Sequence, residues 1–222
     1  MRRLQGYYYP RDIRRTSRRL APKTIVCICC EGAKTEPHYF EALRRDLRLS
    51  SVCVRIIPGD ICGSDPRTVV AWAADMKKDL AAEWPGAVVW CVFDRDEHPQ
   101  IENALCRARD CRICLGFSNP CFELWLLLHY EYSTAQLERD EALRRLRAYI
   151  PAYAKATPVY DFLRERREQA VTHASRLREH HERTRDSRAQ AKPAVNRGST
   201  ARPTDNPSTT VDELVVYLVD MA

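Results

Sequence analysis

Four short apolar runs stand out along the chain, and longer segments of mixed character lie between them. The runs cover residues 24–30, 51–59, 87–93 and 111–117, and polar residues rarely alternate within them. Runs of this kind are typical of strands that are buried on both faces, as in a parallel sheet. The pattern therefore predicts four strands of one such sheet.

Segments with helical periodicity separate these runs. Apolar side chains recur on one helical face after the first two runs, at Phe40, Leu43 and Leu47 and at Val69, Ala73, Met76 and Leu80. Alternating strands and helices imply right-handed βαβ crossovers. We therefore expect an α/β fold with a mostly parallel sheet and flanking helices.

Polar turns that contain a proline mark the predicted helix starts. The pairs are Glu36-Pro37, Asp65-Pro66, His98-Pro99 and Asn119-Pro120. Acidic and amide side chains favour helix N-termini, and proline at the first helical position loses no hydrogen bond. These turns fall at the carboxyl ends of the strands, which is where open parallel sheets bind their ligands.

The chain becomes helical beyond Tyr130. Helical spacing predicts one helix with the apolar residues Leu137, Leu143, Leu146 and Ile150, and a second, long helix over about residues 160–183. Residues 187–209 are polar and rich in Pro, Ser and Arg, which predicts a loop. Thr210 and Glu213 match a capping box, and an apolar stripe that must dock on the core follows at Val211, Leu214, Val215 and Leu218.

The chain therefore divides into three predicted parts. Residues 1–22 form a basic arm, residues 23–130 an α/β core, and residues 131–222 a helical C-terminal region. A chain of 222 residues that is 45% hydrophobic can bury one core with a helical appendage. It has no apolar run of roughly 20 residues and no apolar N-terminal signal, so we expect a cytoplasmic protein without membrane contact.

The net charge of +6 is unevenly distributed. Arginines crowd residues 2–19 and 164–188, and acidic residues partly cancel the second cluster. Clustered arginine suits a polyanionic partner, so the arm residues Arg14, Arg15, Arg18 and Arg19 are candidates for nucleic-acid binding. A solvated tail is the alternative for the arm, and a solvated helix face for the second cluster.

The ten cysteines do not indicate disulfides or zinc. Most lie in apolar runs of a chain without an export signal, where reduced thiols act as small apolar side chains. Cys111 and Cys114 form a single CxxC pair, whereas a structural zinc site needs four ligands.

Carboxylates follow two of the predicted strands. Glu31 ends the first run, and Asp94 and Asp96 end the third in the sequence "FDRDEH". Neighbouring strands lie about 4.8 Å apart, so these acids can converge and would repel one another without a cation between them. Mg²⁺ or Mn²⁺ suits such a group, and Gly32 leaves room for a phosphate. The alternative is that these acids are helix caps or belong to a solvated loop.

Four motifs resemble a known family. "CEGAKTEPHYF", "VFDRDEH", "SNPCFELWLLLH" and "NPSTTVDELVVYL" are similar to the RloB-like family of bacterial restriction-locus and phage-defence proteins, and the pairing of Glu-Gly with Asp-x-Asp resembles the Toprim fold. The resemblance implies that Glu31, Asp94 and Asp96 hold a divalent metal. It also implies that Lys155 neutralises charge on a phosphate, and that the partner is a large ATPase of the AAA or ABC type encoded alongside.

Further candidates lie around these motifs. Glu123 is a lone acid in an apolar helix, where it is costly if buried and unpaired, and its alternative is the solvated end of that helix. Glu36 stays outside the implied ligand set, because its spacing from Glu31 is one residue longer than in overcoming-lysogenization-type Toprim nucleases. His98 and His129 can orient a phosphate or water, although single histidines near aromatics are more often structural.

Two functions follow from the sequence. The first is a metal-dependent nuclease in which Glu31, Asp94, Asp96, Glu123 and Lys155 act on DNA, transfer RNA or another RNA. The second is a non-catalytic subunit that binds metal or nucleotide and docks on the ATPase. A GxxxxGK[ST] phosphate loop is missing from the sequence, so an ATP-driven step requires the partner. A topoisomerase or primase would need a further domain, and the oligomeric state stays open.

Overall fold

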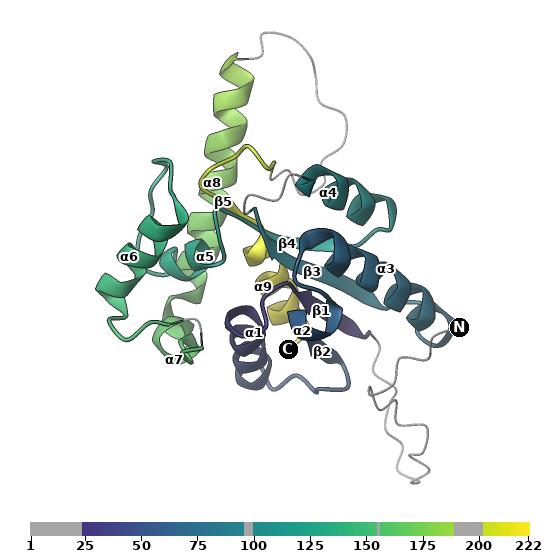
Figure 1. The fold of residues 1–222 in the computed structure, drawn as a ribbon. Coiled ribbons are helices and arrows are strands. Elements are labelled where there is room, and N and C mark those ends of the chain that lie inside the picture. The colour runs from purple at the N-terminus through teal and green to yellow at the C-terminus, as the bar shows by residue number, and fades with distance from the viewer. Residues whose placement is uncertain (1–23, 96–99, 155, 189–201) are drawn as a thin grey trace.

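The computed structural model describes residues 24–95, 100–154, 156–188 and 202–222, and its centre is a five-stranded sheet (Figure 1). The strands are β1 (Val26–Cys30), β2 (Val54–Ile57), β3 (Val88–Asp94), β4 (Cys114–Asn119) and β5 (Ser208–Thr209). Their order is β2-β1-β3-β4-β5, and β5 alone is antiparallel to its neighbour. The predicted α/β fold with a mostly parallel sheet is confirmed.

Burial on both faces explains why the central strands are almost uninterrupted apolar runs. In β1, Val26, Ile28 and Cys30 belong to one buried cluster, and Cys27 and Cys29 belong to the cluster on the other face. Neither face of this strand meets water, so neither needs polar residues. The cysteines among the described residues are free thiols, as predicted.

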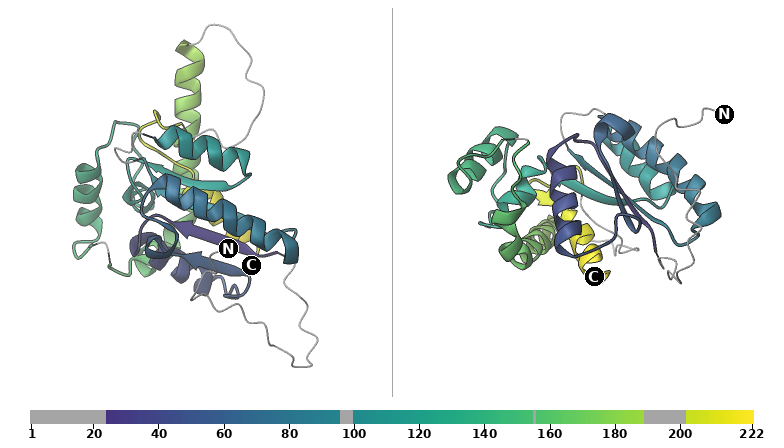
Figure 2. Two further views of the ribbon diagram at one scale, coloured as in Figure 1. Left: turned by 45° about the vertical axis from the view of Figure 1, so that its right-hand side comes forward. Right: turned by 90° about the horizontal axis from the view of Figure 1, so that it is seen from below.

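Helices cover both faces of the sheet (Figure 2). The face that contains Cys27 is covered by α3 (Pro66–Glu83) and α4 (Ile101–Asp110), with the short α2 (Gly59–Cys62) beside them. On the opposite face pack α1 (Thr35–Asp46) and α9 (Val211–Asp220). None of the helices in the described ranges is long and apolar enough to cross a bilayer.

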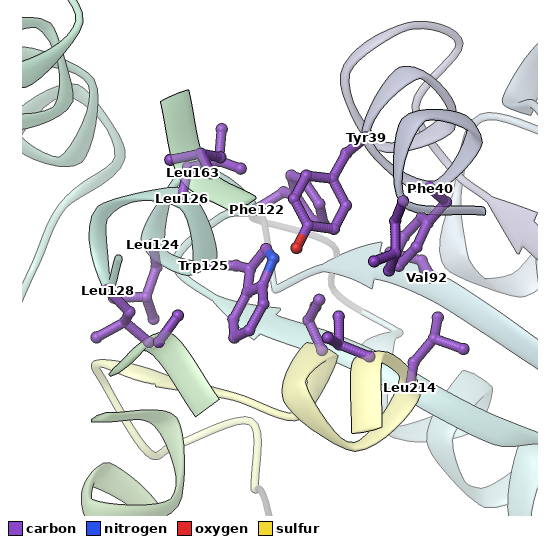
Figure 3. Packing of buried hydrophobic residues seen from close by; sticks show 14 of the residues in the cluster. Tyr39, Phe40, Val92, Phe122, Leu124, Trp125, Leu126, Leu128, Leu163 and Leu214 are labelled. Atoms are coloured by element: carbon purple, nitrogen blue, oxygen red, sulfur yellow. The ribbon is translucent and has the colours of Figure 1, made fainter. Parts of the chain in front are cut away.

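The helical C-terminal region packs on the face that carries α1. It contains α6 (Arg139–Tyr149), α7 (Tyr160–Leu163), the 3-10 turn Arg164–Arg166 and α8 (Arg167–Arg188), and α5 (Glu123–Leu127) precedes it in the chain. Tyr39, Phe122 and Trp125 meet edge to face at its centre, and Figure 3 shows side chains from α1, α5, α7 and α9 gathered around them. One continuous hydrophobic cluster therefore joins the sheet to the C-terminal helices.

One of the predicted helix starts is confirmed and two are wrong. Asp65 caps α3, and its carboxylate accepts hydrogen bonds from the amides of Arg67 and Thr68. The first helix instead begins at Thr35, so Glu36 lies inside its first turn. Asn119 does not cap α5, which begins at Glu123, because its amide group donates to the carbonyls of Pro203 and Asp205. The predicted start at His98-Pro99 lies outside the described residues.

The final helix docks on the core as predicted. Val211, Leu214, Val215 and Leu218 are fully buried. The capping box is wrong, because the Thr210 hydroxyl accepts a hydrogen bond from the Phe117 amide and donates one to the Leu115 carbonyl. Thr210 therefore ties the C-terminal segment to β4.

Candidate active site

A cavity of about 450 Å³ opens at the carboxyl ends of β1 and β3. Four carboxylates line it, together with two basic side chains: Glu31, Glu36, Asp94, Glu123, Lys34 and Arg139. The acids come from the end of β1, the first turn of α1, the end of β3 and the start of α5. The structure thus brings together Glu31, Asp94 and Glu123 from the predicted set and adds Glu36.

Strand pairing places Glu31 beside Asp94. The Glu31 amide donates to the Val92 carbonyl at 2.9 Å and so continues the ladder between β1 and β3. The Glu31 carboxylate then accepts a hydrogen bond from the Asp94 amide at 3.2 Å. The Glu31 side chain, which follows β1, therefore holds the last residue of β3.

Two glycines allow the backbone to approach closely at this edge. A Cβ atom on Gly32 would lie 2.0 Å from Oε2 of Glu36. The space beside Gly32, which we expected to admit a phosphate, is therefore occupied by the Glu36 carboxylate. A Cβ atom on Gly59 would lie 1.9 Å from the carbonyl oxygen of Glu31. Any larger residue at either position would displace a group of the cavity wall.

Asp94 lies at the electrostatic centre of the cavity. Burial raises the pKa of its carboxyl well above the ordinary value, and the charges of Glu36, Glu123 and Glu31 act in the same direction. Arg139 opposes them, and its guanidinium donates to Oδ2 of Asp94 at 3.1 Å. The acids therefore repel one another, and one arginine compensates them in part.

Glu123 is buried rather than solvated, which corrects the surface alternative. Its side chain is only 4% exposed, and Oε1 accepts a hydrogen bond from the Tyr153 hydroxyl at 2.9 Å. The carboxylate raises the pKa of the Tyr153 hydroxyl and of the nearby Cys121 thiol, in both cases after the larger effect of burial. A buried carboxylate whose hydrogen-bond donors are neutral, here the Tyr153 hydroxyl and the Cys121 thiol, is costly unless positive charge approaches it.

His129 lies apart from the cavity. Its Nδ1 is 2.9 Å from the Trp125 carbonyl, and its ring packs edge to face against Trp125 and Tyr39. Burial lowers its pKa to about 4, so the ring is neutral at physiological pH. The structural alternative for His129 therefore holds.

Several predicted residues lie outside the described residues. They are Asp96, His98, Lys155 and the arm residues Arg14, Arg15, Arg18 and Arg19. Their places in a site stay predictions.

Sequence reasoning missed Glu36 and Arg139 as cavity residues. Glu36 was set aside on its spacing, but the early start of α1 turns it toward the strand ends. Arg139 opens α6, far along the chain from the strand motifs, and nothing in its local sequence distinguishes it from other arginines of that helix.

The donor set suits a hard divalent cation. All four acids offer carboxylate oxygens, which Mg²⁺ and Mn²⁺ prefer. Within the described ranges, no group of three or more His, Cys, Asp or Glu side chains is arranged to hold a metal ion. Mg²⁺ usually keeps several waters and binds through one or two carboxylates and substrate phosphate, so the pair Glu31 and Asp94 meets its needs.

A comparison with protein families gives one match. The family model described as RloB-like protein matches residues 26–218. No curated protein and no solved structure matches this chain significantly.

Proposed function

The chain belongs to the RloB-like family, and on that premise we propose that it is a divalent-metal-dependent nuclease that hydrolyses phosphodiester bonds in DNA or RNA. One observation carries the proposal: four carboxylates line a single cavity at the carboxyl edge of a parallel sheet, and, after the larger effect of burial, the charges of three of them raise the pKa of the fourth, Asp94. Such a group is unfavourable by itself and becomes favourable around a cation. The biological setting that we propose is phage defence together with an ATPase partner.

Glu31 and Asp94 are the proposed metal ligands, with Asp96 as a third from the sequence. A bound Mg²⁺ or Mn²⁺ would activate water and offset charge on the phosphate. The hydrogen bond from the Asp94 backbone amide orients the Glu31 carboxylate, and Arg139 holds the Asp94 side chain. A cation that binds both carboxylates would compete with the Asp94 amide for Glu31 and with Arg139 for Asp94.

Arg139 and Glu123 have distinct proposed roles in this cavity. The Arg139 guanidinium holds Asp94 before binding, and a phosphate that enters the cavity offers it a second anionic partner. Glu123 is oriented by Tyr153 and is positioned to accept a proton from water or from a ligand of the cavity. Lys155 is proposed from the family resemblance alone.

Cleavage assays test the proposal directly. Purified protein is incubated with plasmid DNA, total RNA and transfer RNA in Mg²⁺ or Mn²⁺, with and without the ATPase. We expect cleavage by the wild type, and none by Glu31→Gln or Asp94→Asn. Glu83→Gln, which changes an exposed acid at the end of α3, is the matched control and should cleave normally. Full activity in a folded Glu31→Gln protein would reject the mechanism.

Calorimetric titration with Mn²⁺ separates the nuclease from the non-catalytic alternative. Glu123→Gln should reduce metal affinity or turnover, whereas Tyr153→Phe, which keeps the carboxylate, should have a smaller effect. Metal binding that requires Glu31 without cleavage of any substrate, with the ATPase present, would favour the non-catalytic subunit.

A further inference from the structure

A second cavity lies beside the acidic one, between α3 and α4. Its volume is about 340 Å³, and its polar lining residues are Arg67, Thr68, Gln100, Asn103 and Arg107. The two helices lie side by side on the same face of the sheet (Figure 1), and both begin at its carboxyl edge. We call this cavity the α3–α4 groove.

The α3–α4 groove is basic and is not lined by a carboxylate among the described residues. Its floor is formed by Ala71 and Ala104, whose small side chains leave room between the helices. Arg67 donates to the neutral side-chain oxygen of Gln100. Arg107 is exposed, and among the described residues it has no acidic partner. Both guanidinium groups are therefore available to an anion.

Several other arginines of the described chain are paired with acids. Arg144 pairs with Glu141, and Arg178 pairs with Asp212. Asp65, near the groove entrance, accepts hydrogen bonds at the start of α3 from two amides and from the Thr68 hydroxyl. The lining of the α3–α4 groove thus carries net positive charge, which Asp65 offsets in part at Arg67.

The α3–α4 groove adjoins the acidic cavity. Ser64 lines the acidic cavity and Arg67 lines the groove. They are three positions apart in the chain, so their Cα atoms lie at most about 11 Å apart. A polyanion with regularly spaced phosphates can therefore contact the groove while another of its phosphates enters the acidic cavity.

We propose that the α3–α4 groove binds the phosphodiester backbone of a single nucleic-acid strand and leads that strand to the acidic cavity. This proposal rests on the proposed nuclease function and names where its substrate binds. Arg67 and Arg107 contact phosphates, and the amides of Gln100 and Asn103 donate to phosphate or sugar oxygens. These contacts recognise the backbone and not the base sequence.

Binding without metal tests the α3–α4 groove independently of cleavage. Fluorescence anisotropy measures the affinity for labelled single-stranded RNA and DNA in EDTA, over a series of salt concentrations. We expect Arg67→Gln/Arg107→Gln to weaken binding and to reduce the slope of log K against log salt by about 1.4, which corresponds to two lost contacts with a single strand. Arg109→Gln removes one exposed charge from α4 outside the groove lining and should leave this slope unchanged.

The outcomes distinguish the groove from the nuclease proposal. If the double variant keeps the wild-type affinity and slope, or if the wild type binds neither strand, the groove proposal is wrong. Displacement by mononucleotide as effective as by oligonucleotide would assign the groove to free nucleotides and overturn it as well. If strand binding depends on Arg67 and Arg107 but Mg²⁺ and Mn²⁺ support no cleavage, the groove stands and the nuclease function fails.

A second variant separates a loss of strand binding from a loss of folded structure. Arg107→Glu leaves the contact between Arg67 and Gln100 intact and places a negative charge in the α3–α4 groove. We expect it to weaken strand binding more than Arg107→Gln, with an unchanged circular dichroism spectrum and melting temperature. Equal binding by a folded Arg107→Glu protein would also overturn the proposal.

Discussion

Asp94 combines burial with three acidic neighbours, which makes its charge costly in the folded protein. Its raised pKa means that the folded state holds the proton more tightly than the unfolded chain. Folding stability therefore falls as the pH rises from the unfolded value near 3.8 through the folded pKa. At neutral pH and without metal, the cavity is a source of instability.

We predict that Asp94→Asn raises the melting temperature in metal-free buffer at neutral pH by a few degrees. A tenfold change in proton affinity is worth about 1.4 kcal/mol, and each kcal/mol moves the midpoint of a chain of this size by about 2–4 °C. The gain should shrink as the pH falls toward 4. Calorimetric scans between pH 4 and pH 8 measure it.

Metal provides the control for this prediction. If the proposed site binds Mg²⁺ in the folded state, the ion should stabilise the wild type and should stabilise Asp94→Asn much less. Glu83→Gln should behave like the wild type in both buffers. A variant that is less stable than the wild type at every pH would contradict the electrostatic account of Asp94.

His129 gives stability the opposite dependence on pH. Its folded pKa of about 4 lies below the usual 6.5, so the unfolded chain binds the proton more readily. Stability from this residue is complete above pH 6.5 and is lost as the pH falls toward 4, by roughly 3 kcal/mol. His129→Asn keeps a donor for the Trp125 carbonyl but cannot titrate over this range.

We predict that the free energy of unfolding of His129→Asn varies less with pH than that of the wild type between pH 6.5 and pH 4. Urea denaturation at fixed pH values measures both proteins, and their difference isolates this residue. His180→Asn, at an exposed position of α8 away from the aromatic cluster, serves as a control that should keep the wild-type slope. Parallel pH profiles for His129→Asn and the wild type would rule out the assigned ionisation.

The positions of site residues could be predicted from the sequence where these residues directly follow a buried strand. Glu31 and Asp94 follow apolar runs, and parallel pairing leaves such positions little freedom. Glu123 was found because an acid in an apolar helix needs a partner. Arg139 could not be found, since its contact with Asp94 depends on how α6 packs against the sheet edge.

At the scale of elements, the long periodic segments were predictable and the short polar ones were not. Four strands and the final helix lie where apolar patterns placed them. The fifth strand, Ser208–Thr209, was missed because it pairs through two polar residues inside a segment expected to be a loop. The start of α5 was wrong because Asn119 bonds to a distant segment, and local capping rules do not include such partners.

The role of the arginines in helix α8 could not be predicted from their local sequence. It was expected to be a solvated face or a nucleic-acid groove, yet Arg178 forms two short hydrogen bonds with Asp212, of 2.6 and 2.7 Å. Their side chains are only 15% and 4% exposed. This pair fastens α9 to α8, so at least one arginine of the helix has a structural role.

We predict that Arg178→Met destabilises the protein by about 3 kcal/mol, because it leaves the Asp212 carboxylate buried without its partner. Arg183→Met, on the same helix, breaks an exposed pair with Glu179 and should cost less than about 0.5 kcal/mol. Urea denaturation compares the two. Combining Arg178→Met with Asp212→Leu should recover part of the loss, and equal effects of the two single variants would contradict the assignment.

At the scale of the whole molecule, charge is segregated. The chain carries a net charge of +6, while four carboxylates gather in one cavity beside the basic α3–α4 groove. In the proposed nuclease, the surplus of positive charge would attract a polyanion, and the acidic cavity would repel phosphate until a cation is bound. Metal and nucleic acid should therefore promote each other's binding at this edge.

The basic arm, residues 1–22, is the largest source of positive charge outside the described residues, and its role stays a prediction. We predict that replacing Arg14, Arg15, Arg18 and Arg19 by alanine weakens nucleic-acid binding and flattens its dependence on salt, by about 0.7 in slope for each lost contact with a single strand. Because the arm and the α3–α4 groove are separate sets of charges, their effects on the slope should add when the variants are combined. Anisotropy titrations of the arm variant, the groove variant and their combination provide the comparison. An affinity that does not change with salt in any of these proteins would instead indicate a protein or small-nucleotide partner.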